Sequence, residues 1–309
     1  MLFYSSAISG LDVFIPGIIL LGLSIGFLSG LLGVGGGFLI TPMLNILFGI
    51  PYNVAVGSGL VQMVGTAISG IIGHRKRGNV DIKLGLVLAS GSLVGIFAGT
   101  RFINFLRDMQ TITINSREIV AVNFYISILY AGLLLYVGGN MYREAFHSKD
   151  DRMNGNSSVA QRLVKALQVP PLFHMKHSTL DSISIWVLLF SGLCIGFLSG
   201  LMGVGGGFVV LPFMIYALGM PTSIAIGTSL LYVLLSAVMG SFAHLISRNV
   251  DWGIVIFILA GSISGAQLGA LLSSRIRAVL LRRYFVVLVG IAFLLVVGNV
   301  LVSMGWIVF

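Results

Sequence analysis

Charged residues are scarce in this chain of 309 residues. Lys, Arg, Asp and Glu together make up 9% of it, whereas a soluble domain carries roughly 25%. Four stretches contain none of these residues: 13–74, 119–142, 182–247 and 252–274. Each is longer than the ~20 residues that an α-helix needs to cross a bilayer. The lack of charge therefore excludes an ordinary soluble domain and predicts a chain embedded in a membrane.

Cysteine is nearly absent as well. The single Cys194 lies in an apolar stretch, cannot form an internal disulfide, and is interpreted as a small packing residue. No cluster of Cys and His with metal-ligand spacing occurs, so neither a metal site nor another cofactor is expected. Apart from Asp12 at the edge of the first segment, the predicted spans also lack acidic residues, and no nucleophile–base pair is visible. We therefore expect that the protein is not an enzyme.

The basic residues that do occur indicate a membrane surface rather than a nucleic-acid partner. The formal net charge is +9, and no DNA- or RNA-binding motif accompanies it. If the N-terminus lies outside and each hydrophobic segment reverses the chain, fourteen of the eighteen Lys and Arg fall in cytoplasmic loops; the other four are Arg101, Arg107, Arg117 and Arg248. An excess of Lys and Arg on the cytoplasmic side is the rule for membrane proteins. We therefore predict a multi-pass protein of the cell inner membrane with both termini outside.

A glycine-rich stretch occurs twice. Residues 26–44 are GFLSGLLGVGGGFLITPML and residues 196–214 are GFLSGLMGVGGGFVVLPFM, with thirteen of nineteen positions identical at a spacing of 170. Further pairs continue at this spacing without a gap, including His74 with His244 and Asn79-Val80-Asp81 with Asn249-Val250-Asp251. The chain is therefore a duplicated unit, which has to be recognised before any fold is assigned.

Each half contains about five hydrophobic segments. They are about 11–32, 38–49, 53–74, 82–106 and 119–142, and then about 182–202, 208–219, 223–246, 252–274 and 283–306. The second segment of each half has about twelve residues, too few for a full span. The first two segments of each half are thus expected to be short, tilted or re-entrant helices around the GVGGG break.

The two halves are predicted to be inverted relative to each other. Equivalent loops have opposite charge bias, and an odd number of segments places equivalent loops on opposite membrane faces. The predicted fold is an all-α polytopic membrane protein with two inverted-topology repeats, 1–143 and 182–309, joined by a cytoplasmic polar connector, 144–181. Within the connector, VAQRLVKALQ is expected to form a short surface helix that ends before Pro170-Pro171.

The GVGGG sequences are the first candidate for a binding site. They lack the last glycine of the dinucleotide fingerprint and the Lys-Ser/Thr pair of a P-loop. Irregular backbone at membrane depth is tolerated only where it is buried in protein or lines a cavity. Free N–H groups at helices that begin at Phe38 and Phe208 would form an anion site. The alternative is that the glycines merely permit close helix packing. The candidate cradle comprises Gly35, Gly36, Gly37, Gly205, Gly206 and Gly207.

Uncharged polar side chains would have to complete such a site, since the first three hydrophobic segments of each half contain no Lys or Arg. The candidates on the third segments are Ser58, Gln62, Thr228 and Tyr232. Gln62 and Tyr232 are equivalent positions and both polar, which favours a cavity-facing role. Other hydroxyls near the breaks or on these segments are Ser29, Ser199, Thr41, Thr66, Ser229 and Ser236. Each hydroxyl can instead bond a carbonyl of its own helix.

Histidines, Asn-Val-Asp sequences and spaced glycines provide three further expectations. His74 and His244 end the third segments, and gating or proton coupling is one hypothesis for them because imidazole titrates near neutral pH. A helix-end residue at the interface is the alternative. The two Asn-Val-Asp sequences are expected to cap the following helices. The series Gly91/Gly95/Gly99 and Gly261/Gly265/Gly269 are expected to be helix-packing faces.

These motifs together resemble the sulfite exporter TauE/SafE family of anion permeases. The resemblance rests on the paired GFLSG-[LM]-[LM]GVGGGF-x₃-P stretches, the A-[VI]-G-[ST] segments at Ala55–Ser58 and Ala225–Thr228, and the H-x₄-NVD pairs. It covers both halves, while the long connector departs from short members. The resemblance implies transport of sulfite, sulfonates or related organic anions across a bacterial or archaeal inner membrane, without choosing among them.

The residues alone predict an inverted-repeat transporter for an anion. With the resemblance, the prediction becomes a secondary transporter that moves a sulfur-containing oxyanion by alternating access. Its expected partners are the small anion and the lipid bilayer, with protons as a hypothesis for the coupling ion; no nucleic acid is expected, and oligomerisation is left open. An anion-selective channel is the main alternative, and an intramembrane enzyme is a weaker one.

Overall fold

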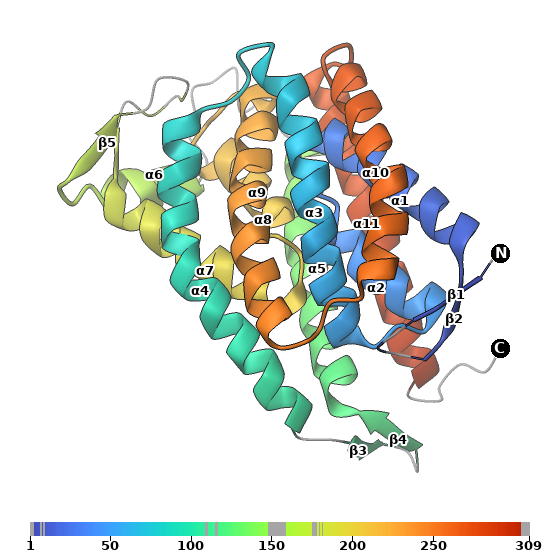
Figure 1. The fold of residues 1–309 in the computed structure, drawn as a ribbon. Helices are drawn as coiled ribbons and strands as arrows, with labels where there is room; N and C mark the ends of the chain where they lie inside the picture. Colours follow the sequence, from blue (N-terminus) through green and yellow to red (C-terminus); the bar gives the residue numbers. More distant parts are fainter. Residues whose placement is uncertain are drawn as a thin grey trace.

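The computed structural model describes residues 3–6, 8, 10–108, 111–114, 117–147, 159–174, 178, 180 and 182–303. These residues form a bundle of helices with three short two-stranded hairpins (Figure 1). In the first half the elements are β1 (Phe3–Ser5), β2 (Asp12–Phe14), α1 (Ile15–Leu32), α2 (Gly37–Phe48), α3 (Tyr52–Arg75), α4 (Ile82–Asp108), β3 (Thr111–Ile114), β4 (Arg117–Val120) and α5 (Ala121–His147). The remaining elements are α6 (Val159–Ala166), β5 (Leu172–His174), β6 (Ser182–Ser184), α7 (Ile185–Met202), α8 (Gly207–Pro212), the π-helix η1 (Phe213–Ala217), α9 (Thr222–Ile246), α10 (Trp252–Ser273) and α11 (Ala278–Ser303).

Eight helices of the described residues are long and apolar enough to span a membrane. They are α1, α3, α4, α5, α7, α9, α10 and α11, four in each half. The second apolar segment of each half is shorter: α2 covers Gly37–Phe48, and α8 with η1 covers Gly207–Ala217. The predicted all-α polytopic fold is thus confirmed. The three hairpins were not predicted from the sequence.

Glycines allow the spans of the two halves to approach each other closely. On the α1 side, the backbone carbonyls of α10 fill the space that a side chain would need. A Cβ atom at Gly22, Gly26 or Gly30 would lie 2.0–2.3 Å from the carbonyl oxygens of Ile258, Ser262 and Ala266. On the α10 side, Gly261, Gly265 and Gly269 meet carbonyl oxygens of α1 in the same way. The predicted packing role of this glycine series is confirmed.

The same arrangement recurs between α7 and α4. A Cβ atom at Gly192, Gly196 or Gly200 would lie 2.2–2.4 Å from carbonyl oxygens of α4, and Gly91, Gly95 and Gly99 face α7 in turn. The first helix of each half therefore packs on the fourth helix of the other half, while α3 packs on α9. The α1–α10 pair and the α7–α4 pair are thus equivalent contacts, and each joins one half of the chain to the other.

The connections between helices gather at two ends of the bundle. The α3–α4 and α10–α11 turns lie at one end, and the α9–α10 loop and the β3–β4 hairpin lie at the other (Figure 1). Arg75, Lys76 and Arg77 thus lie at the same end as Arg275 and Arg277, as the charge count predicts. The membrane face to which this end belongs, and the inverted relation of the halves, stay predictions.

The duplicated unit begins with a hairpin rather than with a helix. The β1–β2 hairpin precedes α1 and pairs Tyr4 with Val13, while β5–β6 precedes α7 and pairs Phe173 with Ile183. Val13 and Ile183 are again 170 residues apart. The last part of the predicted connector therefore pairs with the start of the second half. The expected surface helix is confirmed as α6, and residues 148–158 of the connector lie outside the described residues.

Candidate functional site

Both GVGGG sequences break the chain between two helices with left-handed backbone. Gly33 follows α1 with φ +74°, and Gly35 and Gly36 have φ +77° and +80° before α2 begins. In the second half, Gly203, Gly205 and Gly206 repeat this pattern with φ between +67° and +70°. Glycine is the residue that adopts such angles without steric cost. The helices begin at Gly37 and Gly207, one residue before the predicted Phe38 and Phe208.

The two breaks contact each other in the folded protein. A Cβ atom at Gly37 would lie 2.7 Å from the carbonyl oxygen of Val204, and one at Gly207 would lie 2.4 Å from that of Val34. The rings of Phe38 and Phe208 stack with their centroids 5.6 Å apart. The starts of α2 and α8 therefore converge, although 170 residues separate them.

Two apolar side chains fill the space around the breaks. A Cβ atom at Gly37 would lie 2.4 Å from the sulfur of Met63, and one at Gly35 would lie 2.3 Å from a methyl of Val233. Met63 and Val233 are equivalent positions on α3 and α9. Sequence reasoning missed them because it looked for polar groups; their place in the duplication was the only available signal. In this conformation the glycines act as packing residues, whatever further role they have.

The first backbone N–H groups of α2 and α8 do not take part in the hydrogen bonds of the first helical turns. Leu39 and Ile40 both donate to the Gly36 carbonyl at 3.1 Å, and Val209 and Val210 donate to Gly206 at 3.1 and 2.9 Å. The amides before them are those that an α-helix leaves without an intrahelical acceptor. The positive end of the helix dipole lies there. An anion of suitable size would be stabilised at this point.

Gln62 and Tyr232 are fully buried. The Oε1 atom of Gln62 accepts no hydrogen bond from the described part of the chain. The Tyr232 hydroxyl makes no hydrogen bond of standard geometry there, although it lies near the side chain of Ser92. The amide of Gln62 donates to the hydroxyl of Thr66. A Cβ atom at Gly206 would lie 3.2 Å from the Tyr232 hydroxyl. Tyr232 thus lies directly against the glycine break of its own half.

A second equivalent pair has the same property. Ser29 and Ser199 are each 1% exposed, and their hydroxyls have no partner among the described residues. The Cβ of Ser29 lies 3.6 Å from the Cβ position at Gly36. An unsatisfied buried polar group costs about 1–3 kcal/mol. Each of the two equivalent pairs has a member next to a glycine break, so these four side chains are candidates for contact with a polar ligand.

Ser58 and Thr228 connect the two halves in this conformation. The Ser58 hydroxyl accepts from the amide of Asp251 at 3.0 Å, and that of Thr228 accepts from the amide of Asp81 at 2.9 Å. Asp251 also caps α10 by accepting from Gly253 and Ile254, as predicted for the Asn-Val-Asp sequences. Each hydroxyl still has its own proton to donate. Their role in anion binding stays a prediction.

His74 and His244 lie close to carbonyls just before the glycine breaks. The Nε2 atom of His74 is 3.1 Å from the Gly30 carbonyl, and that of His244 is 3.4 Å from the Gly200 carbonyl. These bonds require the Nε2–H tautomer, since a carbonyl only accepts. In His244, Nδ1 lies 3.5 Å from the side-chain amide of Asn249. Both rings are buried. They support the ends of α1 and α7, and proton coupling stays a hypothesis.

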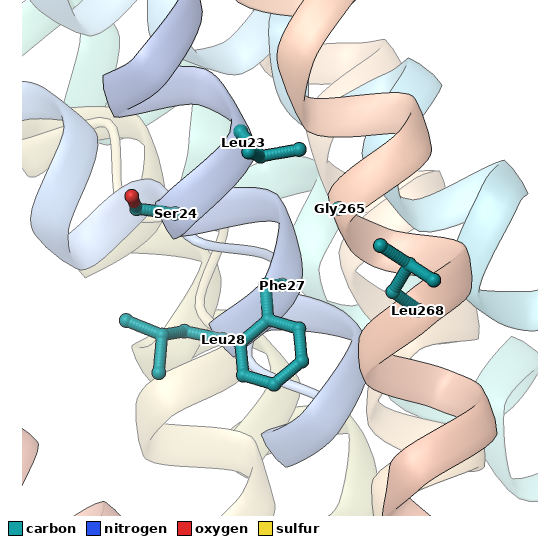
Figure 2. Close-up of a pocket in the computed structure, with 6 residues that line it drawn as sticks. All are labelled: Leu23, Ser24, Phe27, Leu28, Gly265 and Leu268. Carbon is teal, nitrogen blue, oxygen red and sulfur yellow. The ribbon is translucent and has the colours of Figure 1, made fainter.

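Apolar hollows occur elsewhere on the bundle. One of about 390 Å³ lies between α1 and α10 and is lined by Leu23, Phe27, Leu28 and Leu268 with Ser24 and Gly265 (Figure 2). Its lining offers almost no hydrogen-bond donors, so it does not suit an anion. The convergence of α2 and α8 is the better candidate site.

The sequence profile of the family described as sulfite exporter TauE/SafE matches residues 18–296. The chain belongs to this family. A probable membrane transporter protein, YunE, of Bacillus subtilis (strain 168) is 25% identical over 88% of this chain and 94% of its own length. A probable membrane transporter protein of Xylella fastidiosa (strain Temecula1 / ATCC 700964) is 29% identical over 82% and 83%.

A more distant TauE/SafE relative is the probable membrane transporter protein MJ0441 of Methanocaldococcus jannaschii, 24% identical over 76% of this chain and 74% of its own length. No solved structure matches the chain. The membership agrees with the resemblance carried by the paired glycine motifs. This TauE/SafE protein is a multi-pass membrane protein of a transporter family.

Proposed function

We propose that this TauE/SafE protein is a secondary transporter that moves a sulfur-containing oxyanion, such as sulfite or a sulfonate, by alternating access. The anion would be held by the first amides of α2 and α8 together with the hydroxyls of Ser29, Ser199 and Tyr232 and the Nε2 hydrogen of Gln62 that does not bind Thr66. The observation that carries the proposal is the convergence of two helix starts beside buried polar atoms without partners. Family membership supports the transport function.

The chemistry of these groups favours an oxyanion over a cation. Backbone N–H groups and hydroxyls donate to negative oxygens, and the helix dipoles add positive potential at the same point. The candidate site includes no acidic side chain to attract a cation. Several donors without a cationic side chain suit an anion that must be released again.

Alternating access would explain why the glycine breaks are so tightly packed here. Met63 and Val233 fill the space between the breaks, so an anion needs these side chains or helices to move. Equivalent contacts of α1 with α10 and of α7 with α4 supply two similar units that can exchange roles. The conformation described here would then be one in which the breaks are closed on each other.

The anion-selective channel is the alternative, and proteoliposome experiments distinguish the two. We expect saturable uptake of labelled sulfite or of a labelled sulfonate that is accelerated by unlabelled anion on the opposite side. Such counterflow requires a site that alternates between the faces. A flux that rises linearly with concentration and shows no counterflow would instead support the channel.

Glycine variants alone are a poor test of the binding site. At Gly36 a side chain would meet the Cγ2 of Ile25 at 2.6 Å, and the backbone angle is positive. Gly36→Val therefore changes folding and binding together, and the same holds for Gly206→Val. Variants of the unpartnered side chains separate these effects, and a thermal-shift screen with sulfite, sulfate, thiosulfate, sulfoacetate, taurine and carboxylates would show which ligand stabilises the wild type.

A further inference from the structure

Helix α6 presents an apolar row to the surroundings next to two cations. Leu163 is 61% exposed and Leu167 is 54% exposed, while Val164 is buried. Arg162 and Lys165 on the same helix are exposed. A short helix with exposed leucines and cations is typical of segments that lie in the interface of a membrane.

The exposed row continues onto the first two turns of α7. A hollow of about 420 Å³ lies there, lined by Leu167, Val169, Trp186, Val187 and Phe190 with two serines. Trp186 is 59% and Phe190 is 68% exposed, and the indole N–H of Trp186 donates to the Pro170 carbonyl at 3.2 Å. Tryptophan is enriched where a span meets the headgroup region. Since α7 is a membrane span, the hollow faces lipid.

The start of α1, which is equivalent to the start of α7, lacks this combination, so the duplicated unit does not require it there. The positions equivalent to Trp186 and Phe190 are Pro16 and Leu20, and residues 1–14 contain no Lys or Arg and one acidic residue, Asp12. In the described residues before α1, no cation accompanies the positions that correspond to Trp186 and Phe190. We refer to Arg162, Lys165, Leu167, Trp186 and Phe190 as the α6 groove.

We propose that the α6 groove binds an anionic phospholipid. Its phosphate would lie on Arg162 and Lys165, and one acyl chain would fill the hollow beside Trp186. Charge complementarity identifies the headgroup, and continuity with the lipid-facing surface of α7 identifies a lipid rather than a soluble anion. The inference does not depend on the transported substrate.

Native mass spectrometry of the purified full-length protein tests the proposal with dioleoyl phosphatidylglycerol and dioleoyl phosphatidylcholine. A cation near an anionic headgroup contributes about fivefold in affinity, so two should give roughly a 30-fold preference for phosphatidylglycerol. Arg162→Gln/Lys165→Gln should abolish the preference. The control Arg275→Gln/Arg277→Gln removes the same charge from an exposed turn and should keep it.

Two further measurements distinguish the contribution of the headgroup to binding from that of the acyl chain. Leu167→Ser should weaken binding of both lipids while leaving the ratio unchanged, and glycerol 3-phosphate alone should not compete. Equal binding of the two lipids by the wild type, or an unchanged preference in the Arg162/Lys165 variant, would overturn the proposal. Full competition by glycerol 3-phosphate would indicate a soluble phosphate site instead.

Discussion

At the scale of single residues, the buried polar atoms divide into two groups. Ser58 and Thr228 are engaged by amides of the opposite half, whereas Gln62 and Tyr232 keep an oxygen without a hydrogen bond of standard geometry in the described residues. A hydroxyl that only stabilises the fold would be expected to have a partner, because leaving it unpaired costs free energy. The Tyr232 hydroxyl, which can donate, is therefore the sharper marker of the proposed anion site, whereas Gln62 could meet an anion only through its Nε2 hydrogens.

Tyr232→Phe should weaken anion binding with little effect on stability. The hydroxyl makes no hydrogen bond of standard geometry and loses only its contact with the Ser92 side chain, while a charge-assisted bond to an anion contributes about 1.5–3 kcal/mol. Binding measured by calorimetry or by ligand-induced thermal shift should fall by roughly 10- to 100-fold. Tyr130→Phe is the contrast, because the Tyr130 hydroxyl donates to the Phe38 carbonyl and its loss should lower the unfolding temperature. Wild-type anion affinity in Tyr232→Phe would remove this residue from the site.

His244→Gln should alter the pH dependence of transport while keeping anion affinity, if the imidazole carries a coupled proton. Glutamine retains an amide that can donate to the Gly200 carbonyl, where the His244 ring lies now, but it does not titrate. His74→Gln tests the equivalent ring, which lies at the Gly30 carbonyl. Transport measured between pH 5 and 8 in both variants and in the double variant checks this. Three unchanged profiles would leave only the structural role.

At the scale of elements, glycine-lined helix pairs allow very close backbone contacts between the two halves. Between α1 and α10, and between α4 and α7, backbone carbonyls occupy the positions where side chains would be. Close approach of this kind lets membrane helices gain dispersion energy and weak Cα–H···O bonds without a hydrophobic driving force. These pairs also join one half to the other.

Gly26→Ala should destabilise the α1–α10 pair by about 1–3 kcal/mol, the usual cost of overpacking. Its methyl group would lie 2.2 Å from the backbone carbonyl oxygen of Ser262, which cannot rotate away. Gly132→Ala on α5 is the matched control, since nothing lies within 4 Å of its Cβ position. That control should be neutral or more stable by up to about 1 kcal/mol, because alanine favours helix. Thermal unfolding in detergent measures both, and equal stability of the two variants would contradict the packing model.

Residues of the β1–β2 hairpin form hydrogen bonds with Asp251 of the α9–α10 loop. Tyr4 donates to Oδ1 of Asp251 at 3.0 Å and Ser6 donates to Oδ2 at 2.5 Å. The Tyr4 ring lies on Gly253, where a Cβ atom would be 2.0 Å from Cζ. The carboxylate is 1% exposed, so these bonds hold a buried charge. The hairpin is therefore anchored to the α9–α10 loop and to the start of α10.

Tyr4→Phe should lower stability by about 1.5–3 kcal/mol, since it removes one donor from a buried carboxylate. Tyr136→Phe is the same chemical change at a tyrosine that is 71% exposed, and it should alter stability by less than about 0.5 kcal/mol. Thermal unfolding of the two variants side by side measures the difference. A Tyr4 variant as stable as the Tyr136 variant would show that the Tyr4–Asp251 hydrogen bond does not stabilise the protein.

At the scale of the whole molecule, the two halves form one bundle in which each completes the other. The first helix of one half packs on the fourth of the other, and the two glycine breaks meet between α3 and α9. Neither half has a complete candidate site by itself. The proposed site, like the bundle, therefore depends on residues from both halves.

The membrane orientation can be tested by labelling of single cysteines in a Cys194→Ala background, since Cys194 is exposed. Ser5 and Gln168 are both exposed and lie on β1 and after α6, so they report on the N-terminus and the connector. Ser157 of the connector lies outside the described residues and is less suitable. Ser5→Cys should react with an impermeant maleimide in intact cells, and Gln168→Cys only after permeabilisation. The reverse pattern would invert the predicted topology.

The sequence by itself determined the membrane class, the duplication, the positions of the spans and the glycine breaks. Hydrocarbon requires long apolar runs, and left-handed backbone favours glycine, so both properties are local and visible in the order of residues. The short second segments and the N-cap at Asp251 were predictable for the same reason.

Only the tertiary structure decided which side chains meet. Ser58 reaches the Asp251 amide across 193 positions of the chain, and Tyr4 reaches the Asp251 carboxylate across 247. Met63 and Val233 occupy the space between the breaks although nothing in their apolar character distinguishes them in the sequence. Contacts of this kind depend on how helices from both halves are rotated and pressed together, and that packing is a property of the whole bundle.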